Sequence, residues 1–401
     1  MAPFNLETCA RPNILALTPY RCARDDYKDD GTNILLDANE NAYGPSIAED
    51  VASAAGKDVD IDFLGLHRYP DPHQPVLKQH LCDLRNTHAH TKKTLTPENL
   101  FVGVGSDEAI DALLRAFCVP GRDRILTCPP TYGMYSVSAQ VNDVALVKVP
   151  LLPAPDFSLD VPAILDALSK DDSNIKLVYL CSPGNPTGSL LAKADVEKIL
   201  NHLTWNGVVV LDEAYIDFAH EDASLAEWVT EFPNLVVMQT LSKAFGMAGI
   251  RLGVAFTSPP IARILNSLKA PYNVSSPTSA LASYAVTDKG LAIMRKNRSK
   301  IVTQRNRIIA QLPQIPGVGR LRGGTASNFL LYEILDAAGN PDNTTALAVY
   351  EKLAETKGVV VRFRGKEHGC LGCLRVTVGT EAEVTRFLDQ LRATLKEVRG
   401  V

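Results

Sequence analysis

One short segment combines an amine, two hydroxyls and a guanidinium. Thr240, Ser242 and Lys243 stand within four residues, and Arg251 follows eight positions after the lysine, between two glycines. A lysine amine can act as a nucleophile and a proton carrier, and a guanidinium binds oxyanions through paired hydrogen bonds. The spacing can therefore bring an amine and an anion clamp to one pocket, although a lysine after a strand is, on its own, more often a surface residue.

Two upstream segments add an acid, a phenol and an amide. Asp212 and Tyr215 follow the apolar run 209–211, and the carboxyl end of a buried strand is where open α/β sheets collect ligands. Asn185 stands in a turn, 182–188, that two prolines and two glycines make irregular. The alternatives are a helix-capping aspartate with a core tyrosine, and a simple tight turn.

A third segment, 103–108, is a candidate phosphate site. Its two glycines connect a strand to a helix that we expect to begin near Asp107, with Ser106 at the cap. Free N–H groups and the helix dipole favour an anion at such an end, although a well-capped helix explains the pattern equally well. A phosphate could use only the backbone N–H groups of Asp107 and Glu108, so we expect their carboxylates to point away.

Short apolar runs alternate with amphipathic stretches around these segments, which predicts an α/β fold: a mostly parallel central sheet flanked by helices, with a smaller α+β domain. We expect an N-terminal arm (1–46) that is part of the small domain, a large domain (47–290) and a C-terminal small domain (291–401). The predicted strands are 100–104, 124–127, 145–149, 176–180, 207–211, 235–239, 253–256, 329–332, 359–362 and 374–378. The predicted helices are 107–117, 161–168, 193–202, 292–311, 346–356 and 383–398, and 313–324 is predicted as a punctuated connection.

Composition excludes several classes of protein. A net charge of −4 gives no basic footprint for nucleic acid, and the uncharged stretch 270–287 is too interrupted by proline and serine for a membrane span. The first residues lack an apolar signal core, so we expect a cytoplasmic protein with reduced cysteines. Only Cys370 and Cys373 have a suggestive spacing, and without a second such pair we expect no metal site.

In this order, the segments resemble the fold type I pyridoxal-phosphate aminotransferases over nearly the whole chain. The resemblance implies pyridoxal 5′-phosphate as cofactor, Lys243 as the residue that forms the Schiff base with it, and Asp212 as the partner of its pyridine nitrogen. It implies hydrogen bonds from Asn185 and Tyr215 to the ring's 3′ oxygen, and stacking of Tyr132 on the ring. The groups implied for the phosphate are Ser106, Asp107, Glu108, Thr240, Ser242 and Arg251.

A narrower resemblance, to the histidinol-phosphate aminotransferase family, lies in segments 36–46, 67–72 and 374–380, with Ala42 where a proline is more usual. It implies a homodimer with shared active sites, because the tyrosine matching Tyr69 reaches the cofactor phosphate of the neighbouring subunit. An aromatic residue in a proline-rich turn is the alternative for Tyr69.

The same resemblance implies the reaction. The amino group would pass between L-histidinol phosphate and 2-oxoglutarate, giving imidazole-acetol phosphate and glutamate, a step of histidine biosynthesis. Arg362 and Arg375 are the expected anion clamps, with Arg364 as an alternative to Arg362, and Tyr20 would add a hydroxyl. Tyr272 packs either on the imidazole or in the scaffold.

Three other functions share these residues or this fold. An aromatic amino-acid aminotransferase and a threonine-phosphate decarboxylase would keep the cofactor residues. A non-enzymatic regulator would carry a DNA-binding domain ahead of the same fold, but only about 46 residues precede the predicted large domain and they show no helix-turn-helix pattern.

Overall fold

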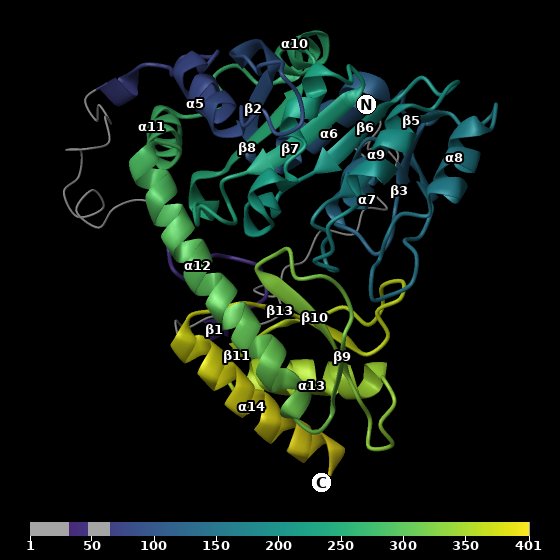
Figure 1. Cartoon of the computed structure of the whole chain (residues 1–401), viewed down its shortest axis with the longest axis vertical. Helices are drawn as coiled ribbons and strands as arrows, with labels where there is room; N and C mark the ends of the chain where they lie inside the picture. Colours follow the sequence, from purple (N-terminus) through teal and green to yellow (C-terminus); the bar gives the residue numbers. More distant parts are fainter. Residues whose placement is uncertain (1–31, 47–64, 401) are drawn as a thin grey trace, which may run out of the picture.

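A mixed sheet of seven strands forms the upper part of the molecule (Figure 1). The computed structural model describes residues 32–46 and 65–400, so Tyr20 lies outside the described residues. The sheet has the order β2-β8-β7-β6-β5-β3-β4, and β8 runs antiparallel to both of its neighbours while the other pairs from β7 to β4 are parallel. Its strands are β2 (Leu100–Val104), β3 (Arg124–Thr127), β4 (Ala145–Lys148), β5 (Ile175–Cys181), β6 (Val208–Asp212), β7 (Leu235–Thr240) and β8 (Leu252–Thr257). The predicted mostly parallel sheet flanked by helices is thereby confirmed.

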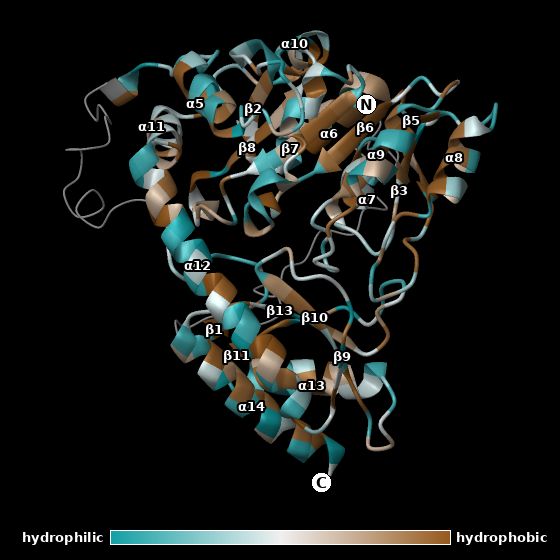
Figure 2. Cartoon of the chain, viewed as in Figure 1, coloured by the Kyte–Doolittle hydropathy of each residue, from teal (hydrophilic) through white to brown (hydrophobic). Residues whose placement is uncertain are grey.

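Helices cover both faces of this sheet because its central strands are apolar on both sides (Figure 2). Along β6, Val208 and Val210 pack in one core with α6 and α7, whereas Val209 and Leu211 pack in the core on the opposite face. The helices of this part are α5 (Pro75–Arg85), α6 (Gly105–Phe117), α7 (Met134–Val141), α8 (Val161–Ser169), α9 (Lys193–Leu200), α10 (Pro259–Leu268) and α11 (Ser276–Ala285).

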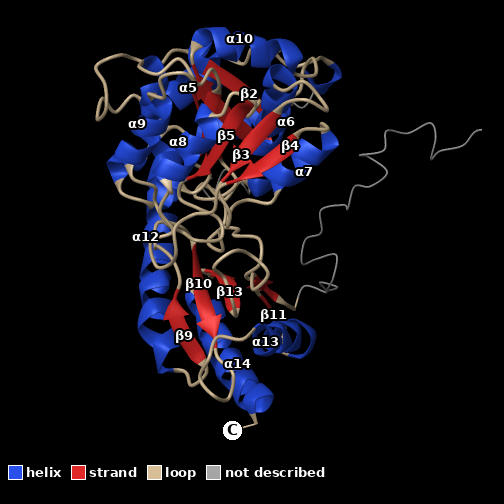
Figure 3. Cartoon of the chain, turned by 90° about the vertical axis from the view of Figure 1, so that its right-hand side faces the viewer, coloured by secondary structure: helices blue, strands red, loops and turns tan. Residues whose placement is uncertain are grey.

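The long helix α12 (Asp288–Gln311) connects the large sheet to a smaller unit below it (Figures 1 and 3). That unit has an antiparallel sheet of order β12-β13-β10-β9, formed by β9 (Val318–Leu321), β10 (Phe329–Ile334), β12 (Arg362–Phe363) and β13 (Cys373–Thr377). Helices α13 (Asn343–Thr356) and α14 (Glu381–Arg399) pack there. The pair β1 (Ile34–Leu35) and β11 (Val359–Val360) ties the described N-terminal residues to this unit.

Short 3₁₀ helices join the regular elements. They are η1 (Gly65–His67), η2 (Pro97–Asn99), η3 (Ile216–Phe218), η4 (Glu221–Ala223), η5 (Ala226–Thr230), η6 (Ala248–Ile250) and η7 (Leu312–Gln314). Within residues 32–46 and 65–400, no helix combines the length and apolar character that crossing a membrane requires.

Several elements differ from the sequence prediction. The strand predicted at 359–362 is two short strands, because β11 pairs with β1 whereas β12 pairs with β13. The connection 313–324 contains β9. Helices α5, α7, α10 and α11 were not predicted. All but α7 have proline in the first turn, where the missing N–H costs nothing.

Candidate active site

Most of the residues predicted to bind a cofactor meet at one cavity. It has a volume of about 240 Å³ and lies where β5, β6 and β7 end and α6 begins, as expected for an open α/β sheet. A larger hollow of about 860 Å³ beside α5 and α10 holds none of the predicted groups. The smaller cavity is lined by Ala38, Glu40, Gly105, Ser106, Asp107, Tyr132, Cys181, Asn185, Asp212, Ala214, Tyr215, Thr240, Ser242, Lys243, Ala248 and Arg251.

Asp212 ends β6 and contributes a deeply buried carboxyl group. Its Oδ2 accepts a hydrogen bond from the Tyr135 hydroxyl at 2.6 Å, and its Oδ1 accepts one from the Ala214 N–H at 3.1 Å. Burial raises the pKa of Asp212 to about 6, although these two donors and Lys243 act in the opposite direction. A carboxylate in this setting gains from any positive charge that enters the cavity.

Tyr135 was missed by the sequence analysis. It is fully buried, stacks on Tyr179 with ring centroids 4.7 Å apart, and meets the edge of Tyr132 at 5.5 Å. Its place at the start of α7, three residues after Tyr132, was a possible signal, but its partner is distant in the sequence. Tyr135 holds Asp212 on the side away from the cavity lining.

Lys243 lies in the turn after β7, half-buried, with Nζ 3.1 Å from the Ala38 carbonyl oxygen and 5.8 Å from the centre of the Tyr215 ring. The Tyr215 hydroxyl accepts a hydrogen bond from Asn39 Nδ2 at 2.9 Å, and burial raises its pKa to about 12. Asn39 is a second residue that the sequence analysis did not single out. The amine and the phenol are thus fixed by the segment 36–46 as well as by the large sheet.

Groups that bind anions gather around the start of α6. The helix begins at Gly105, so Ser106 lies in its first turn, and the prediction that Ser106 caps the helix is wrong. Gly105 has φ +71°, and a Cβ there would stand 2.7 Å from Arg251 Nη2. The close approach therefore requires glycine, and it sets a guanidinium beside first-turn N–H groups, which lack partners within the helix.

The hydroxyls of Thr240 and Ser242 lie beside this end of the cavity, 2.9 Å apart. Thr240 Oγ1 also accepts the Ser242 N–H at 3.1 Å and lies 3.0 Å from the Leu252 carbonyl oxygen. The two side chains are buried and fixed, which leaves little freedom to lose when a ligand binds.

Asp107 and Glu108 behave differently from each other. The Glu108 carboxylate accepts from the Val104 N–H and from Asn273 at 3.1 Å, outside the cavity lining. The Asp107 carboxylate stays beside the cavity, 3.3 Å from the Tyr132 hydroxyl and 3.7 Å from Arg251 Nη2. The expectation that it points away is wrong, because a cation and a hydroxyl donor hold it there.

Arg375 belongs to β13 and reaches the large sheet from the small one. It is 3% exposed, donates from Nη1 to Asn185 Oδ1 at 2.7 Å and from Nη2 to the Asp37 carbonyl oxygen, and lies 5.3 Å from the centre of the Phe329 ring. Its Nε has no hydrogen-bond partner among the described residues. Burial, followed by the nearby Arg364, lowers the pKa of Arg375 to about 9, so this buried cation would be stabilised by an anion.

Arg375 contacts the lining residue Asn185 but is not itself part of the cavity lining, and neither are the other two arginines of this region. Arg362 in β12 is directly opposite Arg375 in the sheet register. Arg364, just after β12, forms an ion pair with Glu367 at 2.7 Å. The ion pair engages Arg364 away from the cavity.

Tyr69 and Tyr272 lie apart from the cavity and stack on each other. Their ring centroids are 4.4 Å apart with an interplanar angle of 15°, and Tyr69 is 80% exposed.

Comparisons with known proteins identify the family to which the chain is similar. Residues 32–391 match the model of the family "Aminotransferase class I and II". The chain is 52% identical to a histidinol-phosphate aminotransferase of Schizosaccharomyces pombe, over 98% of both chains, and 47% identical to one of Saccharomyces cerevisiae, again over 98% of both. A crystal structure of histidinol-phosphate aminotransferase from Sinorhizobium meliloti in complex with pyridoxal-5′-phosphate matches with a TM-score of 0.80 and 26% identity, covering 100% of this chain and 99% of that one.

Proposed function

The chain belongs to the class I and II aminotransferase family, and we propose that it transfers the amino group of L-histidinol phosphate to 2-oxoglutarate with pyridoxal 5′-phosphate as cofactor. The products are imidazole-acetol phosphate and glutamate, and the reaction belongs to histidine biosynthesis. The observation that carries the chemistry is that Lys243 and the buried carboxyl of Asp212 line one cavity with a set of anion-binding groups. The identity of the substrate rests on the full-length relatives.

The residues of the cavity fit this cofactor. A buried carboxylate suits a ring nitrogen that has to stay protonated, and the start of α6 with Arg251, Thr240 and Ser242 suits a phosphate. The glycine at 105 leaves room that a Cβ would fill. Asn185 and Tyr215 would hold the ring oxygen and Tyr132 the ring face, since all three line the same cavity.

Bound pyridoxal phosphate supplies an electron sink that stabilises negative charge on the substrate carbon next to the amine. Lys243 would hold the cofactor through Nζ between turnovers. With the substrate amine in its place, Nζ would be a free base that accepts the proton from the substrate carbon and delivers it to C4′ of the cofactor. Asp212 keeps its negative charge toward the cavity because Tyr135 and the Ala214 N–H occupy its other lone pairs.

Arg375 is the proposed clamp for the substrate phosphate and for the carboxylates of 2-oxoglutarate. Support comes from its burial, from its Nε, which has no hydrogen-bond partner in the part of the chain that the structure describes, and from its contact with Asn185. Arg362, opposite it in the sheet, is the proposed second clamp, in preference to Arg364, which already pairs with Glu367. The role of Tyr20 stays a prediction.

We further propose a homodimer in which Tyr69 enters the partner's site. The exposed, stacked pair of Tyr69 and Tyr272 supports this, because it presents a phenol on a rigid aromatic base and lines no part of its own chain's cavity. Tyr272 would then act as a support for Tyr69 and not as an imidazole platform. A cytoplasmic location stays a prediction, which a fluorescent fusion would test.

A panel of amino donors tests the function. The purified enzyme, loaded with pyridoxal phosphate, is given 2-oxoglutarate and either histidinol phosphate, phenylalanine or phosphothreonine, and glutamate and carbon dioxide are measured. We expect glutamate from histidinol phosphate with kcat/KM at least about 100 times that for phenylalanine, since a site with a buried anion clamp discriminates against donors that lack the anion. Equal use of phenylalanine, or carbon dioxide from phosphothreonine, would overturn the proposal.

A further inference from the structure

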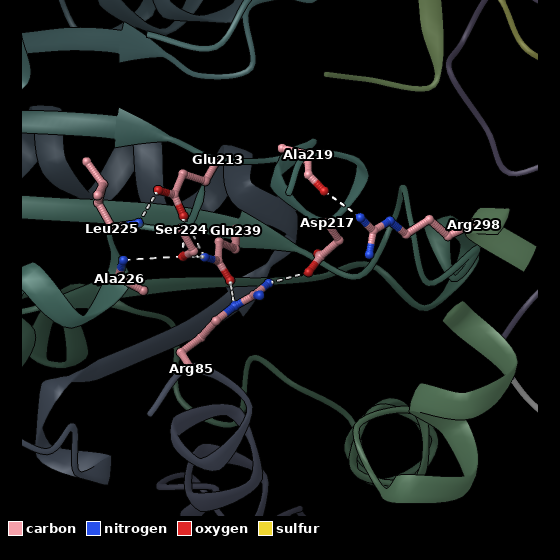
Figure 4. A network of polar contacts seen from close by, with 9 residues as sticks. All are labelled: Arg85, Glu213, Asp217, Ala219, Ser224, Leu225, Ala226, Gln239 and Arg298. Carbon is pink, nitrogen blue, oxygen red and sulfur yellow. Dashed lines mark hydrogen bonds and ion pairs between the residues drawn. The ribbon is translucent and has the colours of Figure 1, made fainter. Parts of the chain in front are cut away.

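Glu213 follows Asp212 directly, yet its side chain points to the opposite face of the sheet. Successive residues of a strand point to opposite faces, so Asp212 and Thr240 face the cavity while Glu213 and Gln239 face away from it. Glu213 is 1% exposed and lies in a network of polar contacts behind the cavity (Figure 4).

Three donors converge on the Glu213 carboxylate. The Leu225 N–H donates to Oε1 at 2.7 Å, and the Ser224 hydroxyl and Gln239 Nε2 donate to Oε2 at 2.7 and 2.8 Å. Burial raises the pKa of Glu213 to about 7, and these donors oppose that rise. The surroundings of residue 213 therefore demand an acceptor at both oxygen positions.

Arg85, the last residue of α5, determines why residue 213 has to accept hydrogen bonds. It donates from Nε to Gln239 Oε1 at 2.7 Å, and because arginine has no acceptor the amide oxygen of Gln239 has to face it. The amide nitrogen of Gln239 is then turned toward Glu213. The polarity of the whole chain of contacts is fixed by one guanidinium.

The same guanidinium reaches the far end of the loop that follows β6. Its Nη2 lies 2.8 Å from Asp217 Oδ1, with both side chains 11% exposed. Glu213 directly follows Asp212, and Asp217 lies two residues after Tyr215. Asp217 contacts Arg85 directly, and Glu213 is tied to it through Gln239 (Figure 4). Farther along, Arg298 of α12 donates to the Ala219 carbonyl oxygen at 2.5 Å.

We propose that Glu213 is a positioning residue, which fixes the segment 212–217 against β7 and thereby sets the position of Asp212 in the cavity. The Glu213 N–H also bonds to the Met238 carbonyl oxygen at 2.8 Å, which continues the β6–β7 pairing one residue past Asp212. The proposal rests on the proposed function, in which Asp212 faces the cofactor ring nitrogen.

The swap of one amide and one acid tests this. In Glu213→Gln, an amide N–H faces a donor whichever way the new side chain turns. In the double variant E213Q/Q239E, the carboxylate now at position 239 accepts from Arg85 and from the amide now at position 213, whose oxygen accepts the Leu225 N–H, so every partner is satisfied again. Glu227→Gln is the matched control, because Glu227 is an equally buried acid that accepts the His88 and His90 N–H groups, makes no hydrogen bond with Glu213 or Gln239, and does not line the cavity.

Two readouts are compared in the four proteins: hydrogen exchange of the amides of residues 213 and 214 without cofactor, and the pyridoxal phosphate affinity from an absorbance titration. We expect E213Q to bind the cofactor about 10- to 100-fold more weakly and to exchange faster at these amides, and E213Q/Q239E to recover to within about threefold of wild type. E227Q should lose thermal stability but keep the affinity.

Wild-type affinity in E213Q, or failure of the double variant to recover it, would overturn the role of Glu213, as would an equal loss of affinity in E227Q. If E213Q alone does not fold, the double variant against wild type decides. Both readouts are made without substrate, so a protein that shows this order but does not use histidinol phosphate would refute the proposed substrate and leave the positioning role intact.

Discussion

The groups assigned to the cofactor and those assigned to the substrate lie in very different surroundings. Asp212, Thr240 and Lys243 follow adjacent strands of one sheet, and their partners within the chain already fix them. The substrate groups belong to the small sheet: Arg375 lies in β13 and Arg362 opposite it in β12, and neither lines the cavity.

This difference indicates a division of labour. The large sheet would supply chemistry that every family member needs, from residues close in sequence and rigid before binding. Specificity would depend on the two arginines that the small sheet brings toward the same place. Substitutions can therefore disable the cofactor groups and the substrate groups separately. Those in the cofactor groups should lower cofactor affinity or kcat, and those in the substrate groups should lower kcat/KM for the substrate.

Lys243→Ala should have the largest effect, on the cofactor side. Loss of the group that we propose both holds the cofactor and moves the proton should lower kcat by at least about 10⁴-fold and abolish the absorbance band of the lysine-bound cofactor. Lys193→Ala, which removes an amine 4.3 Å from the Trp228 ring centre, is the control and should keep both. Turnover retained by the Lys243 variant would refute its assignment.

Arg375→Gln should separate the two sides. Because the buried guanidinium that we propose as the phosphate clamp is replaced by a neutral amide, kcat/KM for histidinol phosphate should fall about 10²- to 10³-fold, while cofactor affinity changes less than about tenfold. Arg364→Gln should lower kcat/KM for histidinol phosphate only slightly, since the Arg364 side chain pairs with Glu367. A larger loss of kcat/KM in Arg364→Gln than in Arg375→Gln would make Arg364 the clamp.

Asp212→Asn tests the buried charge through pH. Burial raises the pKa of Asp212 from 3.8 to about 6 in the folded chain, so its favourable contribution is complete below about pH 4 and is lost as the pH rises through 6. Without cofactor, the variant should therefore gain up to about 3 kcal/mol of unfolding free energy relative to wild type between pH 4 and pH 7.

With bound cofactor, wild type should instead be more stable than Asp212→Asn, because a cation beside Asp212 favours its ionised form. Denaturant unfolding with and without pyridoxal phosphate measures both trends. Asp166 is exposed, so the stability of Asp166→Asn relative to wild type should not change in this way with pH. A relative stability of the Asp212 variant that does not change with pH would mean that the carboxyl is not held in a desolvated site.

Tyr135→Phe should have the smallest effect. Phenylalanine keeps the stacking on Tyr179 but removes the hydroxyl that lowers the pKa of Asp212, so cofactor affinity should fall about tenfold. Tyr179→Phe is the matched control: its hydroxyl contacts the Ile110 carbonyl oxygen at 3.3 Å and not Asp212. Equal losses in both variants would reduce Tyr135 to a packing residue.

Local pattern predicted the strands that bear the cofactor groups, because Asp212 and Thr240 end apolar runs that are buried on both faces. It could not predict contacts whose partners are remote in sequence. Tyr135 meets Asp212 across 77 positions, Arg375 meets Asn185 across 190, and Arg85 meets Gln239 across 154.

Strand pairing gives the second limit. Residues 359–363 have one apolar pattern, but Val359 and Val360 pair with β1 whereas Arg362 and Phe363 pair with β13. Which partner a residue finds depends on the whole fold, so the pattern alone could not divide the segment.

The most direct test compares histidinol phosphate with histidinol, which lacks only the phosphate, in wild type and in Arg375→Gln. For wild type we predict a kcat/KM ratio of at least about 10³ in favour of the phosphate, since the buried guanidinium stays uncompensated without it, and a ratio at least about tenfold smaller in the variant. Similar efficiency on the two donors in wild type, or an unchanged ratio in the variant, would contradict recognition of the substrate phosphate by the small sheet.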